Sequence, residues 1–462
     1  KVSQVVNPAT GQCIDTVPEA TLEDLDRAIG LAVEGQKEWA AVPLHEKQAV
    51  LERYACLVTG NVEKIARVMC EEGGKPIEQC RTEVYANAAI FRIYNAAAYT
   101  FYGKTLPYNG EPRSQGDVAF TIHEPLGVFA NIVPFNYPVE LAAHKLAPML
   151  VTGNSVVLLP SGKTPRSAIL LVELLLEAGV PAGAVSCVTG RGSVVGAAAA
   201  ADPRVAAVSF TGSTGVGISL AETCAKSLRP VSLELGGNDP LIIFDDCNYA
   251  LALDEAINGR LGNAGQTCCA SKRFLVQRGI YDRFVADLAE RLGKVKMGDP
   301  ADPTVELGPC VRESAAVDVE GQIQKTVDQG GVLVCGGHRN GAFVDPTVIK
   351  AGPGMDIARD MEVFGPVWPV IPFDTAEEAL EIANQTIFGL SSGVITSDMK
   401  TAMQVANGVQ AGACIINGSG NYRLAHQPFG CYKYSGIGRE GAVCTLEEMT
   451  QQKMVSFKGI LN

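Results

Sequence analysis

A cysteine and a glutamate whose neighbours suit catalysis stand 34 residues apart in this chain. Cys268 lies in Asn263-Ala-Gly-Gln-Thr-Cys-Cys-Ala270, and Glu234 ends the apolar part of Val231-Ser-Leu-Glu-Leu-Gly-Gly237. A thiolate attacks a carbonyl carbon far better than a thiol does, so a catalytic cysteine needs a base or a lowered pKa. A carboxylate at a strand end, before two glycines, is well placed for that chemistry. The pair predicts a thiol nucleophile and a base, although an isolated free cysteine is more often a buried apolar residue.

Length and composition exclude several functional classes. A chain of 462 residues is long enough for two or more domains. Its net charge of −12 argues against a nucleic-acid or anionic-membrane binder. Fourteen cysteines and five histidines show no metal-ligand spacing, and no apolar run is long enough to span a membrane. We therefore expect a cytoplasmic protein that binds small molecules and no metal.

The pattern of apolar residues predicts helices first and then a sheet. Helical spacing runs from about Thr21 to Val84. Thr105–Pro107 and Val118–His123 are expected to pair as an extended ribbon. The next segments alternate between strand and helix, which predicts an α/β fold with a doubly wound parallel sheet. The predicted strands are Val128–Val133, Ser155–Leu159, Ala184–Val188, Ala206–Phe210 and Val231–Leu235, and the helices are Val139–Leu150, Pro165–Ala178, Val194–Ala201 and Val216–Ser227.

Loops after two of these strands carry polar and glycine-rich sequences. Pro134-Phe-Asn-Tyr-Pro138 places an amide, Asn136, just before a predicted helix start. Thr211-Gly-Ser-Thr-Gly-Val-Gly217 turns from a strand into a helix. Its backbone N–H groups could hold a phosphate, but its spacing is not G-x-G-x-x-G, and an ordinary strand-to-helix turn explains it equally well.

Seven motifs, in order, together resemble the NAD(P)-dependent aldehyde dehydrogenases from about residue 7 to 457. They are Asn7-Pro-Ala-Thr-Gly11, Pro134-Phe-Asn-Tyr-Pro138, Phe210-Thr-Gly-Ser-Thr214, Glu234-Leu-Gly-Gly237, Gly265-Gln-Thr-Cys-Cys-Ala270, Glu362-Val-Phe-Gly-Pro366, and Pro428-Phe-Gly430 with Gly438-Arg-Glu440. The resemblance implies that Cys268 attacks the aldehyde, that Asn136 stabilises the oxyanion, and that Glu234 activates the water that hydrolyses the thioester. Lys145 and Glu440 match positions proposed to relay a proton outward.

The resemblance also implies a site for NAD or NADP. Gly212, Ser213 and Gly217 match the pyrophosphate turn, Glu362 would bind the nicotinamide ribose, and Phe364 would pack near the nicotinamide. The other expected cofactor contacts are Val133, Pro134, Phe135, Ser161, Lys163, Gly192, Phe210, Thr211, Leu235 and Gly236.

The chain departs from the family around the second strand. Leu159 stands where the family usually has the lysine that holds the adenosine ribose, and Gly162 replaces a glutamate of many NAD-specific members. Loss of that negative charge leaves NADP possible. Lys163 either compensates for the missing lysine or is solvated at a helix start. Our hypothesis is that adenosine-ribose binding is weakened for both dinucleotides.

The substrate is predicted to be a small polar or carboxylated aldehyde. The run from Pro134 to Lys145 resembles the branch of lactaldehyde and non-phosphorylating glyceraldehyde-3-phosphate dehydrogenases, and Gly265–Lys272 resembles succinate-semialdehyde dehydrogenases. Thr267 replaces an arginine that phosphate-using members carry, which argues against a phosphorylated substrate. The candidate substrate contacts are His144, Thr267, Cys269, Arg423 and His426, of which the last two read equally well as exposed loop residues.

The resemblance implies three structural parts and a homodimer or homotetramer. These are a dinucleotide-binding domain (1–105 and 127–236), a catalytic domain (237–445) and an oligomerisation element (106–126 and 446–462, with a strand near Gln452–Leu461). Two alternatives stay open. One is an enzyme that passes the acyl group to coenzyme A, which Glu234 disfavours, and the other is a non-catalytic binding protein of the same fold.

Overall fold

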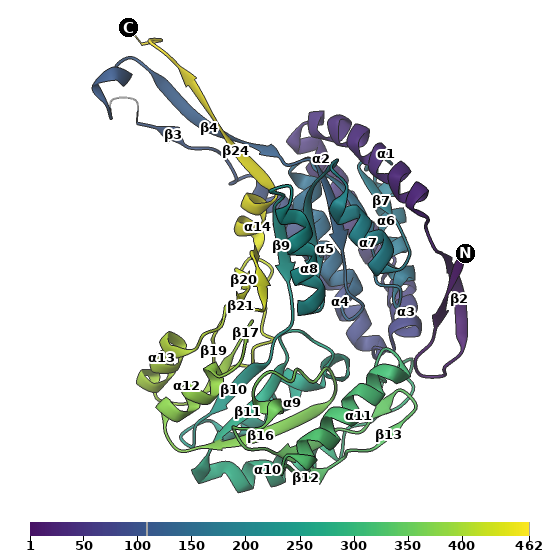
Figure 1. Ribbon diagram of the computed structural model, residues 1–462, viewed down its shortest axis with the longest axis vertical. Coiled ribbons are helices and arrows are strands. Elements are labelled where there is room, and N and C mark those ends of the chain that lie inside the picture. The colour runs from purple at the N-terminus through teal and green to yellow at the C-terminus, as the bar shows by residue number, and fades with distance from the viewer. Residues whose placement is uncertain (108–109, 462) are drawn as a thin grey trace.

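Two sheets, each with helices on both faces, form two lobes, and a β-ribbon projects from the first lobe (Figure 1). The computed structural model describes residues 1–107 and 110–461. The first sheet has the strand order β22-β9-β8-β5-β6-β7. Its five predicted strands are present and parallel, as β5 (Val128–Ile132), β6 (Ser155–Leu159), β7 (Val185–Cys187), β8 (Val205–Thr211) and β9 (Val231–Glu234). The predicted doubly wound α/β fold is confirmed.

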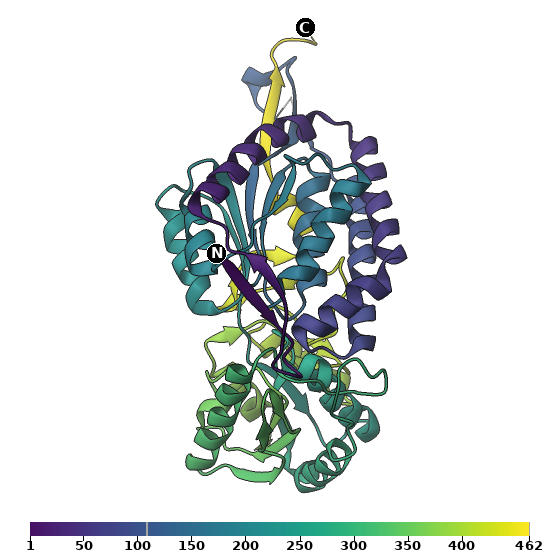
Figure 2. The same cartoon turned by 90° about the vertical axis from the view of Figure 1, so that its right-hand side faces the viewer.

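Alternation along the central strands explains why helices cover both faces of this sheet. Val156 and Leu158 of β6 face one core, whereas Val157 and Leu159 face the other. A strand that is apolar at every position must be covered on both sides. Figure 2 shows the two helical layers. The first core holds α2 (Leu44–Gly60), α3 (Val62–Gly73), α4 (Ile77–Ala98), α5 (Pro138–Val151) and α6 (Pro165–Ala178), and the second holds α1 (Leu22–Ala41), α7 (Gly192–Ala201) and α8 (Thr214–Ala225).

The second lobe contains a seven-stranded sheet with the order β12-β15-β16-β11-β10-β18-β19. Its strands are β10 (Asp239–Ile243), β11 (Ser271–Gln277), β12 (Val332–Cys335), β15 (Thr347–Lys350), β16 (Val367–Phe373), β18 (Gly393–Ile395) and β19 (Ile415–Ile416). The helices α9 (Tyr249–Leu261), α10 (Arg278–Leu292), α11 (Glu313–Asp328), α12 (Ala376–Asn384) and α13 (Met399–Gly408) belong to this lobe. A two-stranded hairpin, β13 (Arg339–Asn340) with β14 (Phe343–Val344), lies beside α11.

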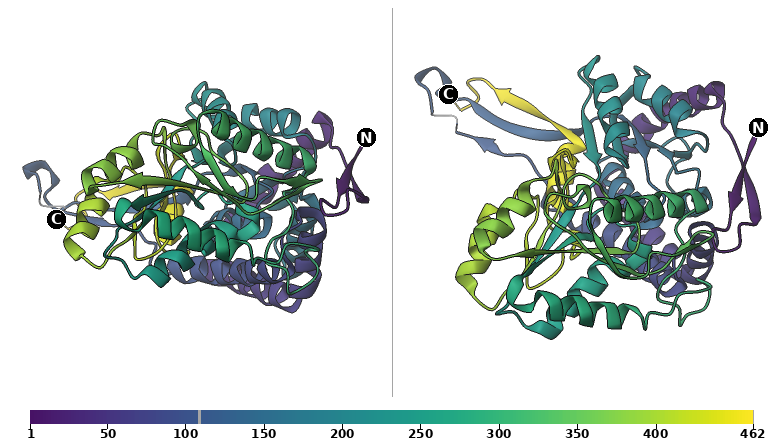
Figure 3. Two further views of the ribbon diagram at one scale, coloured as in Figure 1. Left: turned by 90° about the horizontal axis from the view of Figure 1, so that it is seen from below. Right: turned by 60° about the horizontal axis from the view of Figure 1, so that its bottom comes forward.

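The ribbon combines the two segments that the sequence assigned to an oligomerisation element. The predicted pairing is present, because β3 (Thr105–Leu106) pairs antiparallel with β4 (Val118–Pro125). The C-terminal strand β24 (Thr450–Phe457) pairs with the whole of β4. Residues 108 and 109, between β3 and β4, lie outside the described residues. The N-terminal hairpin, β1 (Val2–Val6) with β2 (Cys13–Pro18), lies on the side of the molecule opposite the ribbon (Figure 3).

The chain returns to the first lobe before its last strand. The short strand β22 (Gly436–Ile437) pairs antiparallel with β9, so that Gly436 lies opposite Glu234. Then α14 (Ala442–Glu448) packs against α4 and α5. Residues 436–437 and 442–448 therefore pack with the first lobe, whereas the sequence assigns residues up to 445 to the catalytic domain. A two-residue strand has no periodicity, so the sequence pattern could not reveal this sixth strand.

Candidate active site

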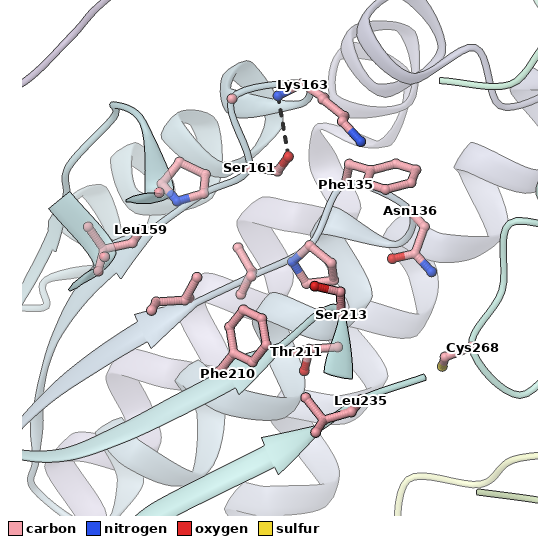
Figure 4. Close-up of a pocket in the computed structure, with 18 of the residues that line it drawn as sticks. Phe135, Asn136, Leu159, Ser161, Lys163, Phe210, Thr211, Ser213, Leu235 and Cys268 are labelled. Atoms are coloured by element: carbon pink, nitrogen blue, oxygen red, sulfur yellow. Dashed lines mark hydrogen bonds between the residues drawn. The ribbon is translucent and has the colours of Figure 1, made fainter. Parts of the chain in front are cut away.

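A cavity of about 440 Å³ lies between the two lobes, at the carboxyl ends of β5, β6, β8 and β9 (Figure 4). The second lobe contributes three lining residues, Cys268, Glu362 and Phe364. Ligands bind at this edge of open parallel sheets. The lining from the first lobe includes Val133, Pro134, Phe135, Asn136, Ser161, Lys163, Gly192, Phe210, Thr211, Gly212, Ser213, Leu235 and Gly236.

Gly217 is the one predicted cofactor residue outside this lining. Its N–H donates to the carbonyl oxygen of Ser213 within α8. A Cβ added at Gly217 would come within 2.4 Å of the Leu235 side chain. In this structure the small size of Gly217 lets α8 pack closely on the residue that follows β9.

The loop that carries the nucleophile has an unusual backbone. Asn263, Ala264 and Gly265 have φ angles of 51°, 55° and 73°, in the left-handed region that non-glycine residues rarely adopt. Buried amides hold this turn. The Asn263 Nδ2 donates to the carbonyl oxygen of Asn136 at 2.8 Å, and the Gln266 Nε2 donates to that of Asn263 at 2.9 Å. These hydrogen bonds compensate the backbone strain and fix the position of Cys268 relative to Asn136.

Asn136 faces the nucleophile across the cavity (Figure 4). Its side chain is buried, and its Nδ2 donates to the carbonyl oxygen of Gln266 at 3.0 Å. An amide nitrogen carries two protons, so one N–H remains for a ligand. The geometry suits a donor to an oxyanion that forms beside Cys268.

Cys268 is held as a thiol in this environment. The hydrogen bond with Cys269, followed by burial, places the pKa of the Cys268 thiol well above its ordinary value. Lys272 and Arg423 act in the opposite direction. Cys269 is buried with Leu390, Phe429 and Cys431 in a small apolar cluster against Cys268. The site must therefore remove a proton before the sulfur can act as a strong nucleophile.

Glu234 is a buried carboxyl group with a raised pKa. Burial, and then the nearby negative charge of Glu440, hold the pKa of Glu234 well above its usual range. Among the described residues, no nitrogen or hydroxyl group donates to its carboxylate, and the Cys431 thiol interacts with it. A carboxyl group tuned upward in this way is suited to accept a proton near neutral pH.

A chain of charges lies behind Glu234. Glu440 accepts from the Lys145 Nζ at 3.0 Å and from the Arg423 guanidinium at 2.8 Å. Burial acts to raise the pKa of Glu440, but these two cations outweigh it and hold that pKa well below its usual range. Lys145 also donates to the Ser209 hydroxyl at 3.0 Å. Glu440 reaches this position because β23 (Arg439–Glu440) pairs with β20 (Phe429–Gly430).

Replacing Glu440 by glutamine should move the acidic limb of the pH–rate profile to lower pH. Glu234 acts as a base only when ionised, so its contribution is lost as the pH falls through its pKa. Removal of the Glu440 charge lowers that pKa, by roughly one unit for neighbouring carboxylates. The check is kcat against pH for the wild type and Glu440→Gln, with the exposed Glu377→Gln on α12 as the control. An unshifted acidic limb in Glu440→Gln would contradict the assignment.

The predicted substrate residues are only partly brought together. The Thr267 hydroxyl bonds to the Tyr137 hydroxyl at 3.2 Å, and Arg423 stacks on the Phe429 ring at 4.1 Å. His144 is buried one residue before Lys145, where burial and then Arg423 lower its pKa to about 3. His426 is instead exposed to solvent, because it lies on the outer side of the loop before Pro428.

The adenosine end of the cavity has open space and one half-buried cation. A Cβ added at Gly162 would meet nothing within 4 Å. The Lys163 Nζ lies 4.0 Å from the centre of the Phe135 ring, and burial lowers its pKa to about 8. Lys163 therefore leans into the cavity instead of being solvated, which the sequence left undecided (Figure 4).

Sequence reasoning missed several residues of the site. Tyr137 and Gln266 stood inside the quoted motifs, so position alone could have drawn attention to them. Lys272 stands four residues after Cys268 in a strand, where a lysine is usually exposed. Its burial was not visible in the pattern.

Comparison with known proteins decides the family. The model of the aldehyde dehydrogenase family matches residues 1–455. The chain belongs to this family. A betaine aldehyde dehydrogenase from Cereibacter sphaeroides is 40% identical over 98% of this chain and 92% of its own length. The prediction of an NAD(P)-dependent aldehyde dehydrogenase is confirmed.

Solved structures agree with this assignment. An aldehyde dehydrogenase from Brucella melitensis biovar abortus superposes with a TM-score of 0.96, at 36% identity over 99% of this chain and 94% of that chain. The glyceraldehyde-3-phosphate dehydrogenase of Methanocaldococcus jannaschii, complexed with NADP, has a TM-score of 0.94, at 31% identity over 98% of each chain. The betaine aldehyde dehydrogenase of Staphylococcus aureus, in complex with NAD⁺, has a TM-score of 0.95, at 34% identity over 99% of this chain and 92% of that chain.

Two further features of the described residues concern membrane-spanning helices and metal-binding clusters. None of the helices in residues 1–107 and 110–461 combines the length and the apolar character needed to cross a membrane. In the same part of the chain, His, Cys, Asp and Glu side chains form no group of three or more that could hold a metal ion.

Proposed function

We propose that this aldehyde dehydrogenase oxidises a small aldehyde with a polar or carboxylated tail and hydrolyses the acyl-enzyme to the free acid, using NAD or NADP. One observation carries the proposal. Cys268 and Asn136 line one cavity, and Glu234, a buried carboxyl group with a raised pKa, ends the strand β9 beside it. A nucleophile, an oxyanion donor and a base thus come together from three separate segments.

The cavity fits a dinucleotide. The buried Thr211 hydroxyl has no hydrogen-bond partner among the described residues and lines the cavity at the end of β8. A Cβ at Gly236 would come within 2.5 Å of the Glu362 carboxylate, so a side chain there would displace that carboxylate. Gly212 and Ser213 would hold the pyrophosphate, and Glu362 would hold the nicotinamide ribose. When bound, the nicotinamide accepts a hydride from the substrate.

The chain's own groups account for the other steps. The Cys268 thiol gives up its proton to solvent water as its sulfur bonds to the aldehyde carbon, and Asn136 Nδ2 with the Cys268 N–H stabilises the oxyanion of the thiohemiacetal. After oxidation to the thioester, Glu234 takes a proton from water, whose oxygen attacks the acyl carbon. The C–S bond then breaks, the carboxylic acid leaves and the thiol is restored. Lys145 and Glu440 pass the proton outward.

Arg423 is the proposed contact for a carboxylated tail. Its Nε is buried and has no hydrogen-bond partner among the described residues, whereas one terminal nitrogen pairs with Glu440. Arg423→Ala should therefore raise KM for an anionic aldehyde about tenfold more than KM for a neutral aldehyde of the same length. Steady-state kinetics with both aldehydes checks this, with Arg423→Lys as the charge-retaining control. Equal increases would remove Arg423 from substrate binding.

A cationic aldehyde is the second candidate. A separate cavity of about 490 Å³, which reaches Tyr137 at the start of α5, is lined by Glu78, Glu83, Glu140 and Glu306. Curated relatives from Cereibacter sphaeroides are named betaine aldehyde dehydrogenases, and betaine aldehyde carries a permanent positive charge. Carboxylates of this kind would favour such a substrate.

A panel of anionic, neutral and cationic aldehydes, each with NAD and NADP, tests the proposal by absorbance of the reduced nicotinamide. Preference for an anionic or neutral polar aldehyde supports it, and preference for betaine aldehyde supports the second candidate. A strict requirement for coenzyme A would instead support acyl transfer. The absence of turnover with every pair would favour a non-catalytic role.

We also propose a homodimer or homotetramer in the cytoplasm. The projecting ribbon exposes the apolar residues Met454, Phe457, Ile460 and Leu461 at its end. An exposed strand edge with apolar side chains favours pairing with another subunit. A monomeric mass in solution would contradict the oligomer.

A further inference from the structure

Lys272 is a buried cation that no step above uses. It stands at the second position of β11, four residues after Cys268, and is 2% exposed. Removing an ammonium group from water is costly unless partners compensate, so its contacts are informative.

Within the described residues, Lys272 interacts with each of the three cavity-lining residues of the second lobe. The Lys272 Nζ donates to the backbone carbonyl of Cys268, lies 3.4 Å from the Glu362 Oε1, and lies 5.9 Å from the centre of the Phe364 ring. One ammonium thus connects the nucleophile, the carboxylate proposed to hold the ribose, and the aromatic ring proposed to face the nicotinamide.

Glu362 is held from a second direction. Its Oε1 also accepts from the Gly237 N–H at 3.3 Å, and a Cβ at Gly237 would come within 2.9 Å of the Cys268 carbonyl oxygen. The Gly237 backbone therefore lies close to both Glu362 and the Cys268 carbonyl, which are the two groups that Lys272 contacts. The positive charge also acts to lower the pKa of the Cys268 thiol.

We propose that Lys272 is a positioning residue that fixes the second-lobe wall of the cofactor cavity, holding Glu362 for the cofactor and Cys268 for attack. This inference rests on the proposed function, because it assumes that a dinucleotide occupies the cavity. Lys272 acts through Glu362 and Cys268 and need not touch the substrate.

The test measures cofactor affinity and thiol reactivity, neither of which requires an aldehyde. For Lys272→Met, the Kd for NAD or NADP should rise at least about tenfold, as expected for loss of a charged hydrogen bond. Alkylation of Cys268 by iodoacetamide should shift to higher pH, because the thiolate loses a nearby cation. Lys272→Arg should keep both properties within about threefold. Lys350→Met, which removes a partly exposed lysine paired with Asp282, should change neither.

The double variant Lys272→Met with Glu362→Gln should bind cofactor no more weakly than the weaker single variant, because both changes remove the same contact. A folded Lys272→Met with the wild-type Kd and alkylation profile overturns the proposal. If Lys272→Met does not fold, the Glu362→Gln variant tests the proposal instead. This variant removes the carboxylate that pairs with Lys272, so the ammonium group should act more strongly on Cys268 and move its alkylation to lower pH. An unchanged alkylation profile overturns the proposal. Failure of the proposed function would look different from failure of the Lys272 proposal, because the wild type itself would then oxidise no aldehyde.

Discussion

Replacing Cys268 by alanine is expected to lower turnover by at least about four orders of magnitude, because the sulfur forms both covalent intermediates. Cys268 lines the cavity beside Asn136, and no other thiol lines that cavity within the described residues. Absorbance of the reduced nicotinamide at saturating aldehyde measures the loss. Cys56→Ala, at an exposed cysteine on α2, is the matched control and should retain full activity.

Cofactor binding separates loss of chemistry from loss of structure. Cys268→Ala should bind NAD or NADP within a few-fold of the wild type, because the pyrophosphate turn and Glu362 are unchanged. Substantial turnover in a folded Cys268→Ala would contradict covalent catalysis by this residue. Loss of both cofactor binding and turnover would point to a damaged fold, and Cys268→Ser would then test the role of the sulfur.

Replacing Glu234 by glutamine should lower steady-state kcat by roughly 10²- to 10⁴-fold, the range expected for a lost general base. The buried carboxyl group is proposed to act on the hydrolytic water, after oxidation. The first turnover should therefore remain fast and the following turnovers slow. Rapid mixing should reveal a burst of reduced nicotinamide, close to the enzyme concentration, before a slow steady state.

The contrast with the Glu440→Gln variant sharpens this prediction. Glu440 changes the pKa of Glu234 and relays its proton but does not touch the water, so Glu440→Gln should shift the pH profile and give a smaller burst than Glu234→Gln. If the Glu234→Gln substitution slowed the first turnover as much as the steady-state turnovers, Glu234 would act before oxidation.

The sequence predicted those features that depend on short-range pattern. The five parallel strands were visible as apolar runs, and the motif residues of the first lobe line the cavity because they lie at or just after strand ends. Partners from distant segments were not visible. The pairing of Glu440 with Arg423 depends on two-residue strands, and the contact of Lys272 with Glu362 joins residues 90 positions apart. Such contacts depend on how the lobe is packed, which no local periodicity encodes.

Gly217 and Lys163 show a different limit. The position of Gly217 in a glycine-rich turn suggested a phosphate contact, but its small size is used against Leu235. Lys163 could equally have been solvated, and its place over Phe135 follows from the aromatic ring that the loop after β5 presents. In both cases the residue type indicated that the position matters, whereas the neighbour that each residue contacts became clear only from the fold.

The most direct test of the central claim is to trap the acyl-enzyme. Glu234→Gln is incubated with cofactor and an aldehyde that the wild type oxidises, and its peptides are then weighed by mass spectrometry. We expect one added acyl group on the Glu234→Gln peptide that carries Cys268, and no added group in the wild type or in Cys268→Ala. An acyl group on another residue, or an unmodified Cys268 during active turnover, would contradict covalent catalysis by Cys268.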